Sequence, residues 1–123
     1  MSKRFIFLGV LVVFAISLNV ALSAMDYPED LKKAVAPYPN AKILQTVNVT
    51  GTVIVIMEAI DKPDTVFEFY KRELTANGWK ILTEVKQEGH NTLISEKGSN
   101  NIVVDIGMDQ AGKSMISLTL APE

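Results

Sequence analysis

Cysteine is absent from the 123-residue sequence, and histidine occurs only once, at His90. The lack of cysteine excludes disulfides, thiolate metal ligands, a cysteine nucleophile and a lipid-modified cysteine. Zinc sites use three or four histidine, cysteine or carboxylate ligands, so a single histidine also disfavours zinc. We therefore expect a domain that is stabilised by packing alone and that holds no metal and no cofactor.

Beyond the N-terminal Lys3-Arg4, clusters of basic residues are also lacking, apart from Lys32-Lys33 and Lys71-Arg72, which are typical of solvated helix faces. The 14 acidic residues outnumber the 12 lysines and arginines, and the formal net charge is −2. Binding of nucleic acid or of anionic lipid depends on concentrated positive charge. The sequence therefore predicts no nucleic-acid partner.

Long hydrophobic runs are confined to the N-terminus. Two basic residues precede an apolar run at 5–16, and the small residues that follow fit cleavage after Ser23 or Ala24. This pattern is typical of a secretory signal peptide, here residues 1–24. The alternative is an uncleaved membrane anchor, but two polar residues interrupt the run before it reaches the roughly 20 residues that a span needs. We expect export to the periplasm or the cell exterior, with membrane association only if the segment stays uncleaved.

Residues 25–123 are predicted to form a single α+β domain that opens with a short N-terminal helix at about 26–37. The other expected elements are a β-hairpin (43–49 and 52–60), a helix (63–77) and four strands (79–86, 91–97, 101–108 and 113–120). Short connections rich in turn-forming residues imply antiparallel neighbours. The prediction is an antiparallel sheet of about six strands, built from a hairpin, a helix and a four-stranded meander, with the main helix packed on one face.

The main helix carries start, face and stop signals that agree. Asp61 is the expected N-cap, and Pro63 lies in the first turn, where its missing N–H costs nothing. Gly78 follows the last turn, where a left-handed backbone ends a helix. At 3.6 residues per turn, the apolar side chains expected to face the core are Val66, Phe67, Tyr70 and Leu74.

Two segments carry a family resemblance: Tyr-Pro-Asn-Ala-Lys at 38–42, and Phe-Tyr-Lys-Arg-Glu-Leu-Thr-Ala-Asn-Gly-Trp at 69–79. They resemble a group of small exported bacterial domains that combine a Tyr-Pro-Gly/Asn-Ala segment with a Phe-Tyr…Leu…Gly-Trp helix end. The similarity spans about residues 37–120. No activity, cofactor or catalytic residue is assigned to that group, so the resemblance implies a fold and an envelope location and transfers no site.

Candidate catalytic and ligand-binding residues are few. His90 is expected in an exposed turn, and a general base would need a nucleophile and an orienting acid, for which Ser95 and Asp105 are the nominees. Asp105, Asp109 and Glu96 are the acids nearest to one another in the predicted meander, but no loop presents acids at the alternating positions of a calcium site. We therefore predict no catalytic and no metal-binding residues.

The sheet face away from the main helix is the predicted functional surface, because alternate side chains of a strand point to opposite faces. Odd positions of 43–49 and 52–60 are expected to point inward. In the next strand, Trp79, Ile81 and Val85 are expected to do the same. Five apolar side chains are then left on the open face: Ile54, Ile56, Leu82, Val103 and Met115.

Contiguous apolar area on a surface marks binding or self-association. The expected occupant of the open face is an envelope protein, an apolar ligand, a second copy of the chain, or the segment 26–41 folding over it. The predicted function is thus an exported, non-enzymatic envelope domain that binds a partner or an apolar ligand. Two alternatives stay open: a small periplasmic hydrolase with an unrecognised site, and a structural component of the envelope.

Overall fold

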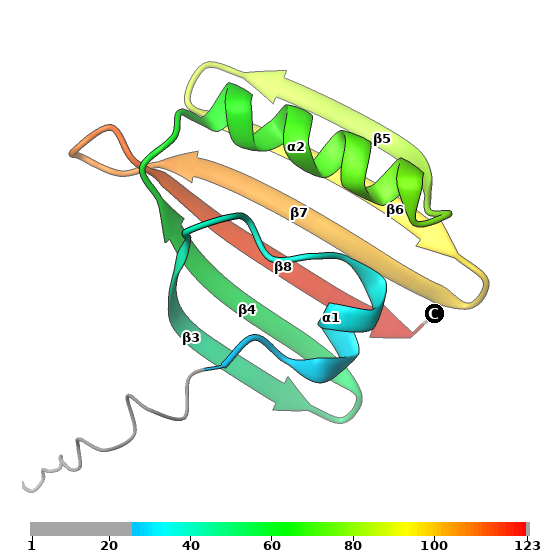
Figure 1. Cartoon of the computed structure of the whole chain (residues 1–123). Coiled ribbons are helices and arrows are strands. Elements are labelled where there is room, and N and C mark those ends of the chain that lie inside the picture. Colours follow the sequence, from blue (N-terminus) through cyan, green and yellow to red (C-terminus); the bar gives the residue numbers. More distant parts are fainter. Residues whose placement is uncertain (1–25, 123) are drawn as a thin grey trace, which may run out of the picture.

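The computed structural model describes residues 26–122, so the predicted signal peptide 1–24 lies outside the described residues. Two helices and six strands follow one another along this part of the chain (Figure 1). They are α1 (Glu29–Ala34), β3 (Lys42–Val49), β4 (Thr52–Ala59), α2 (Pro63–Ala76), β5 (Lys80–Gln87), β6 (His90–Lys97), β7 (Asn100–Met108) and β8 (Ser114–Pro122). The predicted hairpin, helix and four-stranded meander are confirmed.

The strands form one antiparallel sheet in the order β3-β4-β8-β7-β6-β5. The last strand, β8, pairs with β7 on one side and with β4 on the other, so it joins the meander to the hairpin. The two edge strands are β3 and β5. Because β8 closes the gap between hairpin and meander, all six strands share two continuous faces.

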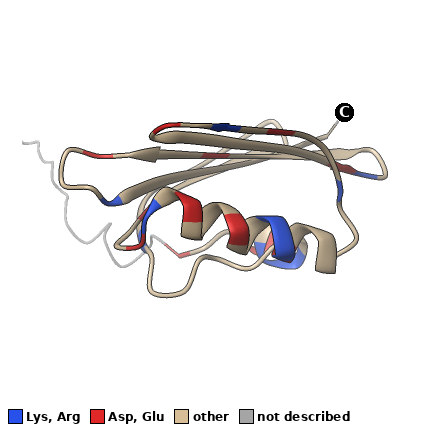
Figure 2. Ribbon diagram, turned by 90° about the horizontal axis from the view of Figure 1, so that it is seen from above, with Lys and Arg blue, Asp and Glu red and all other residues tan. Residues whose placement is uncertain are grey.

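Both helices lie on the same face of the sheet, which we call the covered face (Figures 1 and 2). The helix α2 packs over β5, β6 and β7. Its expected core side chains, Val66, Phe67, Tyr70 and Leu74, are all buried. Neither helix of the described range is long and apolar enough to cross a membrane.

The N-terminal segment 26–41 completes the helix layer on the side of β4 and β8 (Figure 1). Leu31 of α1 is buried in the core, and the Trp79 Nε1–H donates to the carbonyl of Ala34 at 3.2 Å. The Tyr38 hydroxyl donates to the Asp61 carboxylate, just before α2. The expectation that this segment folds over the open face is therefore wrong, because its apolar side chains belong to the core of the covered face.

The start of α2 differs from the prediction in its capping residue. Lys62, not Asp61, is the N-cap, and its side chain makes no capping hydrogen bond. Pro63 occupies the first helical position as expected. Asp61 is not available as a cap, because its carboxylate accepts the Tyr38 hydroxyl, while its carbonyl accepts Ser114 Oγ at 2.7 Å.

The helix α2 stops before Gly78 as predicted, and its end has the hydrogen bonds of a Schellman motif. Gly78 has φ = 85°, in the left-handed region. The Gly78 N–H donates to the carbonyl of Thr75 at 3.2 Å, and the Trp79 N–H donates to the carbonyl of Leu74 at 2.9 Å. These two bonds define the motif, and they aim the chain into β5 with Trp79 buried.

Two bulges change the predicted pleat of the edge strands. In β3 the register shifts between Ile43 and Gln45, and in β5 it shifts between Ile81 and Thr83. Each bulge adds one residue, so the side chains beyond it exchange faces. Val47 therefore pairs with Ile54 on the open face. The expected inward direction of odd positions holds at Ile43 but is wrong for the rest of β3.

The same correction applies to Val85 in β5. It was expected to point inward, but it pairs with Thr92 on the open face and is 37% exposed. In β4 no bulge occurs, and the prediction is confirmed: Val53, Val55, Met57 and Ala59 are buried.

Candidate functional site

The open face, which the described helices leave uncovered, carries two central rows of cross-strand neighbours. The first row runs Val47, Ile54, Thr119, Val103, Ile94 and Thr83. The second runs Gln45, Ile56, Ser117, Asp105, Thr92 and Val85. Neighbouring strands lie about 4.8 Å apart, so the side chains of a row touch or nearly touch.

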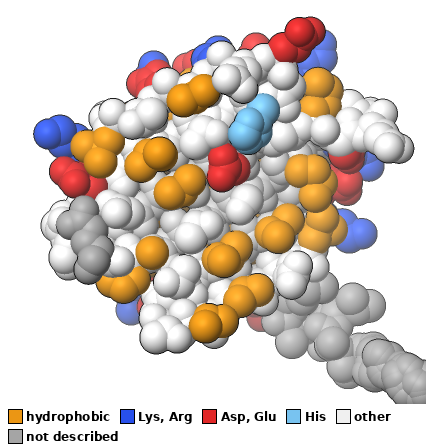
Figure 3. All heavy atoms as spheres, turned by 180° about the vertical axis from the view of Figure 1, so that it is seen from behind, with side chains coloured by type: hydrophobic (Ala, Val, Ile, Leu, Met, Phe, Trp, Pro, Cys, Tyr) orange, Lys and Arg blue, Asp and Glu red, His pale blue; other side chains and the backbone are white. Residues whose placement is uncertain are grey.

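The five predicted surface residues are distributed over this face. Ile54, Ile56, Val103 and Met115 are half-buried there, and Leu82 lies in the bulge of β5, where it is 48% exposed. They do not merge into one apolar patch, because β8 places Ser117 and Thr119 between the apolar residues of β4 and those of β7. Figure 3 shows this face with hydrophobic side chains in groups separated by polar ones.

A carboxylate lies near the middle of the open face. Asp105 Oδ1 accepts Thr92 Oγ1 at 2.8 Å and is 3.6 Å from His90 Nε2. In Figure 3 a histidine and an acidic side chain are adjacent on this face. This pair was within reach of sequence reasoning, which named both residues but placed His90 in a turn. In the structure His90 is the first residue of β6.

Ser95, the third member of the nominated catalytic trio, is not at this position. Its side chain is buried on the covered face, and its Oγ donates to the carbonyl of Ile102 at 3.1 Å. A nucleophile must lie within hydrogen-bond reach of its base. Because Ser95 and His90 are on opposite faces of the sheet, these residues do not assemble a Ser-His-Asp site.

The other charged residues of the open face lie in complementary register. Lys42 is opposite Glu58 at one corner, and Lys80 is opposite Glu96 at another. Asp105 is opposite Ser117 and Thr92. Within the described strands, the Asp105 carboxylate near the centre is thus opposite hydroxyl groups, whereas the peripheral carboxylates of Glu58 and Glu96 are opposite lysines.

The three acids considered for a cation do not converge. Asp109 lies in the turn between β7 and β8, where its carboxylate accepts the N–H groups of Lys113 and Ala111, both at 2.9 Å. These hydrogen bonds, that of Lys113 first, lower the pKa of Asp109. Glu96 is opposite Asn101, in a different row from Asp105. Residues 26–122 contain no group of three His, Cys, Asp or Glu side chains that would hold a metal ion.

The space between the helix layer and the sheet is filled by side chains, among them an aromatic cluster. The rings of Tyr38 and Phe69, and those of Phe69 and Tyr70, lie 5.0 Å apart in edge-to-face geometry. Burial, with the Asp61 hydrogen bond second, raises the pKa of Tyr38 to about 12. Burial also raises the pKa of Tyr70 and of Tyr27, whose hydroxyl donates to the carbonyl of Val35 at 2.9 Å.

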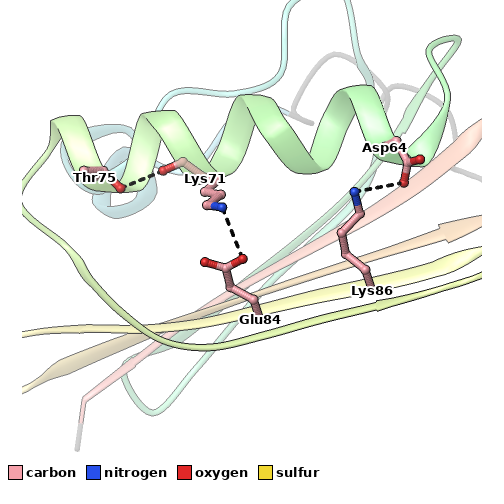
Figure 4. Close-up of polar contacts among 5 residues, drawn as sticks. All are labelled: Asp64, Lys71, Thr75, Glu84 and Lys86. Atoms are coloured by element: carbon pink, nitrogen blue, oxygen red, sulfur yellow. Dashed lines mark hydrogen bonds and ion pairs between the residues drawn. The ribbon is translucent and has the colours of Figure 1, made fainter.

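Two hollows lie at the ends of the helix layer. One, of about 610 Å³, is bounded by the first turn of α2 and by the turns β5–β6 and β7–β8. An ion pair between Lys86 Nζ and Asp64 Oδ1, 3.7 Å apart, connects β5 to α2 beside it (Figure 4). The other, of about 510 Å³, lies near Trp79 at the opposite end of α2. Sequence reasoning identified neither hollow, because both depend on how α2 is placed on the sheet.

A six-stranded antiparallel sheet with the helices on one face defines an α+β domain. By sequence comparison the chain belongs to the START domain-like family, which it matches over residues 41–114. A relative from the archaeon Archaeoglobus fulgidus is 29% identical over 86 residues, which cover 67% of this chain and 94% of the relative. That relative is described as an uncharacterised protein.

Proposed function

We propose that this START-like domain is an exported, non-enzymatic binding module whose open sheet face binds the surface of a partner protein. START folds bind apolar ligands, which favours binding over catalysis. In this chain, however, the space between helix and sheet is filled by buried side chains such as Phe67 and Tyr70. The remaining large surface with apolar character is the open face.

The observation that carries the proposal is the composition of this face. Its two central rows consist of Val, Ile, Thr and Ser side chains together with Gln45 and Asp105, and Asp105 is their single charged residue. Depletion of charge at the centre, with charge at the rim, is typical of protein interfaces. The face presents two broad rows of side chains, whereas sites for small ligands are concave.

Charge complementarity indicates the chemistry of the partner. The lysines at two corners already face glutamates in register, whereas Asp105 faces hydroxyl groups and has no lysine or arginine opposite it, with His90 Nε2 3.6 Å from its Oδ1. A partner surface with an apolar centre and one lysine or arginine opposite Asp105 would satisfy this face. A second copy of the chain would bring another Asp105 into the interface, and like charges oppose association.

The test uses a tagged full chain that is expressed in its native cells. The proteins that copurify with it are identified, and each is then purified for direct binding measurements. Ile56→Ser and Asp105→Asn are each expected to weaken binding at least 10-fold, with the fold retained by circular dichroism. Ile60→Ser is the matched control, because Ile60 is 83% exposed and lies outside the sheet.

A partner that binds all four proteins equally would contradict the proposal. If Ile56→Ser removes self-association of the chain and no other interaction, the occupant of the open face is a second copy. Unfolding of Ile56→Ser would place Ile56 among the residues that the fold requires, and would also contradict the assignment.

A further inference from the structure

The two edge strands of the sheet differ in how their free backbone groups are protected. An edge strand presents a row of N–H and C=O groups to a further strand, and charged side chains discourage such pairing. The edge strand β5 carries three charged residues, and two of them, Glu84 and Lys86, form ion pairs with α2 (Figure 4). The other edge strand, β3, has no charged side chain within residues 43–49.

The helix layer also leaves the edge of β3 more accessible than that of β5. The main helix α2 packs over β5, β6 and β7, at the opposite end of the strand order from β3 (Figure 1). Among the described residues, β3 pairs with β4 and with no other strand. The outer edge of β3 is therefore both uncharged and open to a further strand.

One stretch of β3 has the regular backbone that strand pairing requires. The bulge ends at Gln45 and the two-residue turn begins after Val49, so residues 45–49 form an uninterrupted ladder with β4. These five residues are centred on Val47. Two antiparallel copies related by a two-fold axis at Val47 would pair the whole stretch with itself. That register places Asn48 opposite Thr46 of the second copy, and Val49 opposite Gln45 of the second copy.

The side chains of this register are compatible with one another. On the side of the open face, Val47 meets Val47 of the second copy, and Gln45 of the second copy covers Val49, which is 60% exposed. On the other side, the Asn48 carboxamide lies opposite the Thr46 hydroxyl of the second copy, and these groups can hydrogen-bond. Like charges directly opposite each other oppose pairing, and this stretch contains no charge.

We propose that the edge of β3 binds a second copy of this chain by antiparallel pairing of residues 45–49, which joins the two sheets into one. The interface is isologous, because the same stretch of both copies forms it. A five-residue ladder is a small interface, so the dimer forms in a concentration-dependent manner. The two-fold axis is perpendicular to the sheet, and it keeps both helix layers on one side and both open faces on the other.

The edge dimer goes beyond the proposed function and does not depend on it. The two Asp105 side chains do not meet, because three strand spacings separate β7 from β3 in each copy and one more spans the junction. At about 4.8 Å per spacing they are about 34 Å apart, beyond the roughly 10 Å over which salt screens charges. Two open faces on one assembly would strengthen binding to a partner that presents two sites.

The test uses two charge variants of the full chain. Thr46→Lys/Asn48→Lys, the lysine variant, and Thr46→Glu/Asn48→Glu, the glutamate variant, each place like charges opposite one another across the junction. The dimer dissociation constant of each variant alone is expected to rise at least 10-fold. In an equimolar mixture every lysine lies opposite a glutamate, so we expect a heterodimer at least as strong as the unmodified dimer. Sedimentation equilibrium measures association, and circular dichroism verifies the fold.

Two controls separate the edge from the other surfaces. Gln87→Lys, on the β5 edge, is expected to leave self-association unchanged. Ile56→Ser is also expected to leave it unchanged, because Ile56 lies on the open face of β4 and not on a free edge. A dimer that Ile56→Ser removes and the lysine variant retains would overturn the proposal in favour of the open face. Loss of partner binding on the open face with an intact edge dimer would count against the proposed function alone.

The unmodified chain decides if the charge variants do not fold. In ¹⁵N-labelled protein at rising concentration, the backbone amide signals of residues 45–49 are expected to shift together. Three results would contradict the proposal: no concentration-dependent shift up to about 1 mM, which is the range of weak association, shifts confined to β5, or a mixture of folded charge variants that stays monomeric.

Discussion

The two faces of the sheet use similar residues for different purposes. On the covered face, Ile102, Val104 and Ile106 of β7 are fully buried under the helix layer. On the open face of the same strand, Val103 is half-buried beside Asp105. Both sets are β-branched and apolar, so composition alone does not separate them. What separates them is the covering layer, which makes one face the source of stability and leaves the other available for binding.

The largest effect is expected on the covered face, from Phe67→Ala. Phe67 is 1% exposed in the core of α2, and truncation of a buried phenylalanine costs about 3–5 kcal/mol. Glu68→Ala, at the next and exposed position, is expected to change stability by no more than about 0.5 kcal/mol. Urea unfolding measures both variants. Similar losses in the two would mean that α2 does not pack on the sheet by this face.

The next effect is expected at alkaline pH, where the tyrosines of the covered face ionise. Tyr38 has a pKa of about 12 in the folded protein, above the 10 of an unfolded tyrosine. The folded state therefore retains protons that the unfolded state loses, and stability falls as the pH rises from about 10 to about 12. Absorbance at 295 nm, which reports tyrosinate, should rise together with unfolding. Tyrosines that titrate near 10 in the folded protein would contradict their burial.

A smaller effect is expected at the end of α2, from Gly78→Ala. A side chain at φ = 85° is strained, and we expect a loss of about 1 kcal/mol or more. Space is not the cause, because the added Cβ would approach Lys97 Cε no closer than 3.5 Å. Gly107→Ala is the control, since Gly107 lies on the open face with free space around it and is expected to lose no stability. Equal urea midpoints for both variants would refute the Schellman stop.

Local signals in the sequence predicted the elements well and their arrangement only in part. The strand segments, the main helix and its glycine stop follow from periodicity and turn residues that lie next to one another in the chain. Strand order was not predictable, because the pairing of β8 with β4 joins residues more than 50 positions apart, such as Val55 and Leu118. The faces of β3 and β5 were mistaken beyond the bulges, since no residue type marks a bulge reliably.

The candidate site was predictable to a similar extent. Ile54, Ile56, Val103 and Met115 were placed on the open face by alternation alone, in strands without bulges. Strand order decides that Ser117 and Thr119 divide this face. It also decides that Asp105 lies near the centre of the face. The hollow at the first turn of α2 depends on how α2 is placed on the sheet, which the sequence does not indicate.

The contrast between the faces is tested most directly by one substitution at two adjacent positions, Val103→Ser and Val104→Ser in β7. Val104 is fully buried, and its replacement by serine is expected to lower the free energy of unfolding by about 2–4 kcal/mol. Val103→Ser is expected to lower it by less than about 1 kcal/mol, because its side chain remains half-exposed. Paired urea titrations measure the difference. Equal losses at the two positions would contradict the account, because they would mean that both faces of the sheet are packed.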